Sequence, residues 1–210
     1  MTTRSGPAGW PAVTGSLPTA AAIRRAGWIT LMLGLAVAAR WAATVTDLAD
    51  GIVVGASFGS FLAVAALLAG WRPSKPGGRR LASGAAVGLA GGTALLALAL
   101  ATRWPGPWLP FDPGPSFVPW AAVTILVATT EEVVLRGALF RALADGAGWV
   151  MALLGTSVLF AVLHVPLYGW HVVPLDLGVG LFLGGLRMLT GGTVAPAIAH
   201  AVADLATWWI

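Results

Sequence analysis

The sequence predicts an all-α, polytopic membrane protein: a bundle of about seven transmembrane helices, with six to eight as the range. Of the 210 residues, 58% are hydrophobic and only 10% are charged, and the mean hydropathy is +0.85. Soluble domains carry far more charge than this. Apolar runs of about 18 or more residues, long enough to span a bilayer as a helix, also recur along the chain. They are too many for one signal peptide or a single anchor.

The segment before the first span, residues 1–23, is rich in Gly, Pro and Thr and lacks an apolar stretch. We predict that it is a disordered cytoplasmic segment, and that residues 24–210 form the transmembrane bundle. We draw the spans at residues 26–45, 51–71, 81–102, 117–143, 148–167, 172–189 and 194–210.

Basic residues set the predicted orientation, because cytoplasmic loops of membrane proteins are enriched in Lys and Arg. Arg24 and Arg25 precede the first span, and the basic segment 72–80 joins the second span to the third. The N-terminus is therefore predicted to be cytoplasmic, with the C-terminus on the other side. Arg40 lies near the end of its span, and we expect its side chain to reach the interface by snorkelling. Since Arg outnumbers Lys 11 to 1, we place this multi-pass protein in a bacterial plasma membrane.

The composition also excludes several kinds of function. There are no cysteines, so disulfides, thiolate zinc sites and cysteine nucleophiles are ruled out. The net charge is +4, but the basic residues cluster in short segments between apolar runs. This pattern is typical of membrane topology and predicts no nucleic-acid partner.

Polar residues within the spans are concentrated in the C-terminal half. A charge at the centre of a bilayer costs about 2.5–3.5 kcal/mol on insertion scales, so charged residues there suggest a function. The residues are Glu131, Glu132, Arg136, His164, Asp176, Arg187, His200 and Asp204.

The first group is the stretch TTEEVVLRG, residues 129–137. Glu132 and Arg136 are four residues apart, so they lie on one helix face and can form an ion pair. Glu131 is left without that partner. It could act as a general base inside the bundle, or both glutamates could belong to a structural polar network; the stretch alone favours neither.

Two further pairs have the same spacing, on later spans. Phe160 and His164 share a helix face, and Pro166 then bends or ends the helix beside the imidazole. Taken alone, His164 is better explained by a bond to a neighbouring carbonyl. His200 and Asp204 form the other pair, in which the carboxylate could orient the imidazole or accept its proton. Because three spans each supply acid or base groups, together they indicate a functional site.

Three other polar residues are left out of this site. His171 lies beside a tryptophan in a short turn, and we interpret it as interfacial. Asp176 and Arg187 lie near the ends of the sixth span, where water can reach them.

The three motifs, Glu131-Glu132-x-x-x-Arg136, Phe160-x-x-x-His164 and His200-x-x-x-Asp204, resemble those of the CPBP intramembrane proteases. This family includes the CAAX prenyl endopeptidases and the bacterial Abi, or bacteriocin-processing, proteins. The resemblance covers residues 117–210, which would be the protease core.

The resemblance implies a glutamate-dependent intramembrane endopeptidase in which Glu131 and His164 activate a water to attack a peptide carbonyl. His200 and Asp204 would stabilise the oxyanion, and Glu132, Arg136 and Phe160 would support the site. The family pattern often has Asn at the last position, and an ionised Asp204 could not donate a hydrogen bond to an oxyanion. Asp204 would then either be protonated or act indirectly, by orienting His200.

The family has often been labelled metalloprotease, and Glu131, His164 and His200 are a plausible zinc-ligand set. We nevertheless favour no metal, because there is no HExxH motif. The implied partners are membrane lipids and a peptide or protein substrate that enters from the membrane. These residues do not identify the substrate or indicate whether it is prenylated.

Two other classes of function remain open. A non-catalytic immunity or scaffold protein could keep the polar cluster for binding or folding. A proton-coupled transporter could use the same residues as a relay, although no repeated, interrupted helices of the kind found in transporters are visible.

Overall fold

A computed structural model describes residues 20–72, 77–102 and 116–209, and these are helices and short turns. The α-helices are α1 (Ala20–Val45), α2 (Gly51–Leu68), α3 (Gly78–Thr102), α4 (Phe117–Glu132), α5 (Phe140–Tyr168), α6 (Val173–Thr190) and α7 (Val194–Ala206). A π-helix, η1 (Val133–Leu139), joins α4 to α5, and a 3-10 turn, η2 (Trp170–Val172), precedes α6. The predicted all-helical membrane bundle is confirmed. Most of the predicted N-terminal segment, residues 1–19, lies outside the described residues, and α1 begins at Ala20.

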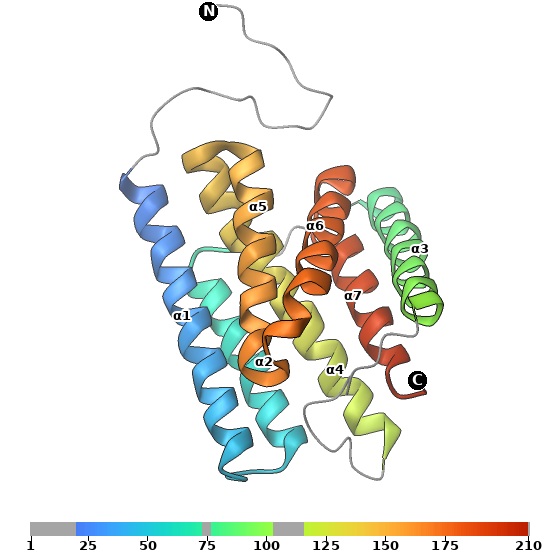
Figure 1. The fold of residues 1–210 in the computed structure, drawn as a ribbon. Coiled ribbons are helices and arrows are strands. Elements are labelled where there is room, and N and C mark those ends of the chain that lie inside the picture. The colour runs from blue at the N-terminus through green and yellow to red at the C-terminus, as the bar shows by residue number, and fades with distance from the viewer. Residues whose placement is uncertain (1–19, 73–76, 103–115, 210) are drawn as a thin grey trace, which may run out of the picture.

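Five helical stretches of the described chain are long and apolar enough to cross a membrane: 20–45, 51–68, 78–101, 117–168 and 170–190. The fourth has 52 residues, and as a straight helix it would be about 78 Å long, more than twice the ~30 Å of a bilayer core. It is not straight, because Gly148 has φ 86° and ψ 166°. The chain reverses there (Figure 1), so this stretch is long enough to cross a bilayer twice, in agreement with the predicted boundary between residues 143 and 148.

Helix α7 is shorter, with 13 residues, and it is covered by α3 from a distant part of the sequence (Figure 1). Glycines on α3 allow this close packing. A Cβ added to Gly88 would lie 2.7 Å from the carbonyl oxygen of Ala195, and one added to Gly92 would lie 2.6 Å from Cβ of Val202. Small residues at helix interfaces are the usual means of close approach in membranes.

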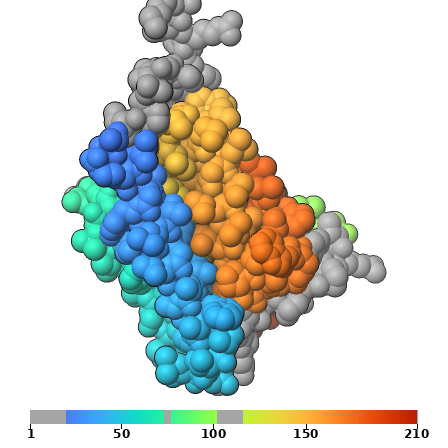
Figure 2. Space-filling model, turned by 60° about the vertical axis from the view of Figure 1, so that its left-hand side comes forward, coloured from blue at the N-terminus to red at the C-terminus, as the bar shows by residue number. Residues whose placement is uncertain are grey.

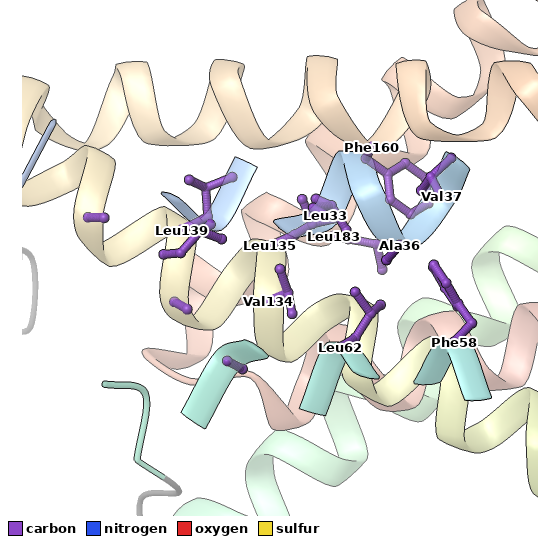
Figure 3. Packing of buried hydrophobic residues seen from close by; sticks show 14 of the residues in the cluster. Leu33, Ala36, Val37, Phe58, Leu62, Val134, Leu135, Leu139, Phe160 and Leu183 are labelled. Atoms are coloured by element: carbon purple, nitrogen blue, oxygen red, sulfur yellow. The ribbon is translucent and has the colours of Figure 1, made fainter. Parts of the chain in front are cut away.

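The apolar core surrounds η1, where α1, α2, α5 and α6 meet (Figure 3). Each of these elements contributes large buried side chains, which include Leu33, Val37, Phe58, Leu62, Leu135, Phe160 and Leu183. On the outside, α1 and α5 lie side by side and cover one face of the bundle (Figure 2). Glu131, Glu132, Arg136 and His200 are buried within this apolar shell.

Candidate active site

The two glutamates lie at the junction between α4 and η1. Glu131 is 8% exposed and Glu132 is fully buried. The helix continues directly into the π-helical turns of η1, whereas the sequence predicts an uninterrupted span over residues 117–143. Single π-turns within helices are frequently found at functional sites. The altered turn leaves the carbonyl of Arg136 to accept a hydrogen bond of 3.0 Å from Nε of Arg187, a residue that the sequence reasoning set aside.

Glu132 and Arg136 form an ion pair, as their spacing predicts. Nη1 of Arg136 donates to Oε1 of Glu132 at 2.8 Å, and both side chains are fully buried. The guanidinium also donates from Nη2 to the carbonyl of Gly180 at 3.0 Å, and it lies 4.7 Å from the ring centre of Phe160. The pair therefore ties α4 and η1 to α5 and α6.

His200, on α7, connects the two glutamates. Its Nδ1 donates to Oε1 of Glu132 at 3.0 Å, and its Nε2 lies 4.0 Å from Oε2 of Glu131. The same Nε2 lies 3.4 Å from Oδ2 of Asp204, whose side chain is 41% exposed. The contact between His200 and Glu132 was not predicted, because sequence spacing indicates pairs within a helix and not pairs between helices.

His164 extends from α5 toward the same region. Its Nδ1 donates to the carbonyl of Phe160 at 2.8 Å and lies 3.7 Å from Oδ2 of Asp176. The ring of Phe160 separates the two histidines, with centroid distances of 4.6 Å to His164 and 5.4 Å to His200. Asp176 was left out of the predicted site, but its position on α6 brings it against His164.

Glu131 and His164 line one small cavity. Its volume is about 10 Å³, approximately the space that one water molecule needs. Its other lining residues are apolar except for one arginine; they are Leu33, Val37, Arg40, Phe58, Leu135, Phe160, Leu163 and Leu167. An apolar enclosure with two acid–base groups in its wall is suited to holding and polarising a single water.

Arg40 corrects the sequence interpretation. We expected its side chain to snorkel to the interface, but it is 11% exposed and its Nη1 lies 4.0 Å from Oε1 of Glu131. Its guanidinium lies 4.8 Å from the ring centre of Phe58. A signal for this inward position is present in the sequence: Arg40 falls three and seven residues after the buried Val37 and Leu33, and so shares their helix face.

The candidate ligands for a metal ion are Glu131, His164 and His200. Among the described residues, no three His, Asp or Glu side chains are grouped so that they could hold a metal ion. Oε2 of Glu131 lies 4.0 Å from Nε2 of His200. Glu131, His164 and His200 therefore do not form such a ligand group in their present arrangement.

A known protein family resembles the C-terminal part of the chain. Residues 113–206 match the family model described as type II CAAX prenyl endopeptidase Rce1-like. No curated protein and no solved structure matches the chain. The matched residues include all three motifs and exclude α1, α2 and α3, so the resemblance predicted from the motifs is confirmed for the C-terminal part. Over residues 113–206, this membrane protein is similar to the Rce1-like type II CAAX prenyl endopeptidases.

Proposed function

We propose that the protein is an intramembrane endopeptidase of the CAAX-protease or Abi type, which hydrolyses a peptide bond with a water activated by Glu131 and His164. The observation that carries this proposal is the cavity: both side chains line one space of about 10 Å³ within an apolar bundle. A carboxylate in such a place is costly. A catalytic role for the Glu131 carboxylate accounts for this energetic cost.

The proposed reaction begins with a water in this cavity. Because Nδ1 of His164 donates to the Phe160 carbonyl, the neutral ring has its lone pair on Nε2, where it can accept a hydrogen bond. Glu131 accepts a proton from the water while the water oxygen attacks the peptide carbonyl carbon. The tetrahedral intermediate then collapses, the C–N bond breaks, and Glu131 returns the proton to the leaving nitrogen.

His200 is placed to stabilise the oxyanion of that intermediate. With Glu132 accepting at Nδ1, His200 can donate from Nε2 only in its doubly protonated form. The carboxylates of Glu132 and Asp204, at 3.0 and 3.4 Å, favour that cation. Asp204 thus acts through His200, and needs no hydrogen bond of its own to the oxyanion.

Glu132, Arg136 and Phe160 support these groups. The buried ion pair fixes the carboxylate that orients His200, and the ring of Phe160 packs against both histidines and the guanidinium. A peptide or protein substrate would reach the site from the membrane. A bacterial plasma membrane is the proposed location. A cytoplasmic N-terminus is supported by Figure 1, in which the arginine-bearing ends of α1, α3 and α6 lie at one end of the bundle.

The experiment measures cleavage of membrane peptides by the purified protein in liposomes. Glu131→Ala and His164→Ala should each abolish cleavage while the protein still inserts and folds, whereas His171→Ala, at an exposed histidine outside the cavity, should cleave normally. Activity retained by either site variant would refute the mechanism. If Glu131→Ala kept the full cellular phenotype, a non-catalytic immunity or scaffold role would replace it. Loss of activity with a chelator, restored by Zn²⁺, would show a metal requirement.

A further inference from the structure

Arg40 belongs to α1, which lies outside the matched residues 113–206, yet its side chain lines the cavity beside Glu131. The side chain is 11% exposed. A guanidinium is as costly as a carboxylate within a bilayer. Its inward position in a helix that otherwise supplies apolar side chains to the core therefore requires a reason.

The other buried arginines have separate partners. Arg136 is occupied by Glu132 and by the carbonyl of Gly180, and Arg187 bonds the carbonyl of Arg136 and lies over Phe140. Among the described residues, the arginine ion pair seen for Glu131 is the one with Arg40. Arg40 therefore supplies a permanent positive charge that directly faces the proposed general base.

The contact is geometrically specific. Nη1 of Arg40 faces Oε1 of Glu131 at 4.0 Å, while Nε2 of His200 faces Oε2 at 4.0 Å. Each carboxylate oxygen thus has its own partner. Both distances exceed a direct hydrogen bond and are the kind that a bridging water can span. The guanidinium is held by the ring of Phe58, which fixes it without using its N–H donors.

We infer that Arg40 is a positioning residue for the proposed hydrolysis: its guanidinium faces one carboxylate oxygen of Glu131 and aims that carboxylate into the cavity. This inference rests on the proposed function for its catalytic meaning, although the pairing itself is independent of it. The other titratable groups that interact with Glu131 come from five elements, and they are Glu132 on α4, Arg136 on η1, His164 and Tyr168 on α5, Asp176 on α6, and His200 and Asp204 on α7. Among them Arg136 carries a permanent positive charge, and its guanidinium is bonded to Glu132 and to the carbonyl of Gly180.

The test uses the full-length protein in liposomes with two readouts. For cleavage, Arg40→Gln should lower kcat by roughly 10- to 100-fold with KM changed by less than about threefold, since the residue acts on the base and not on binding. Arg40→Lys, which keeps the charge, should recover part of the rate. Arg25→Gln is the matched control, because Arg25 lies on the same helix but bonds the carbonyl of Ala69; it should keep the wild-type kcat.

The second readout does not need activity. Infrared difference spectra between each protein and its Glu131→Gln derivative report the environment of the Glu131 carboxyl group. The carboxyl band of Glu131 should shift in Arg40→Gln, because the guanidinium that faces Oε1 is removed. The inference is overturned if that band is unchanged, or if Arg40→Gln cleaves at the wild-type kcat. If the wild type cleaves no peptide but the band depends on Arg40, the proposed function fails and the pairing stands.

Discussion

Replacing Arg136 by Met should lower the free energy of unfolding more than replacing Glu131 by Gln. The substitution removes hydrogen bonds of 2.8 and 3.0 Å to Glu132 and Gly180, together with the contact to Phe160. It leaves a carboxylate with no exposure and a single remaining partner, His200. Breaking a buried pair by removing one member typically costs about 3–5 kcal/mol. We expect Arg136→Met to lower the free energy of unfolding by that amount.

The assay is reversible unfolding in mixed micelles with increasing SDS, followed by fluorescence of the 11 tryptophans. Arg72→Met is the control, because Arg72 is exposed and bonds backbone carbonyls at the end of α2; it should change stability by less than about 0.5 kcal/mol. Glu131→Gln should cost less than about 1 kcal/mol, since its ion pairs are 4.0 Å long. A loss for Arg136→Met below about 1 kcal/mol would refute the assignment of this pair as the structural anchor.

Three further changes test the packing and the site. Gly180→Ala should destabilise the protein by about 1–3 kcal/mol, because its Cβ would lie 3.0 Å from Cα of Ser157; Gly185→Ala, with open space around it, should be neutral in the same SDS titration. Gly148→Ala should cost about 1–3 kcal/mol through backbone strain, since Gly148 has φ 86°; an unchanged midpoint would argue against the chain reversal there. Asp204→Asn and Asp204→Ala should each lower kcat by roughly 10- to 100-fold, because both remove the carboxylate charge that favours the doubly protonated form of His200; a wild-type kcat in Asp204→Asn would show that this charge does not support His200.

Much of the fold follows from the hydropathy of the sequence. Apolar runs place the spans within a few residues of the observed helices, and the break at Gly148 agrees with the glycine-rich boundary drawn there. The π-helix at η1 was not predicted, because its residues have no local preference for i→i+5 bonding. It is stabilised by contacts from other helices, such as the bond from Arg187 to the carbonyl of Arg136.

Only those contacts of the candidate site that lie within one helix could be predicted from the sequence. The pairs Glu132–Arg136 and His200–Asp204 follow from i,i+4 spacing. The contacts of Glu132 with His200 and of His164 with Asp176 depend on how helices pack, and spacing along one helix contains no information about that. The prediction that Arg40 snorkels was wrong because it rested on the position of Arg40 near a helix end. The helix face that Arg40 shares with buried Leu33 and Val37 indicates the inward position instead.

The central claim is that Glu131 and His164 act on the same water, and a double-mutant cycle in the rate of cleavage tests it most directly. Glu131→Gln and His164→Gln should each lower kcat by about 10²- to 10⁴-fold. If both groups activate one water, the double variant should be slower than the slower single variant by no more than about tenfold, because residues that act as a unit are not additive. Losses that multiply in the double variant, or a wild-type kcat in either single variant, would contradict the mechanism.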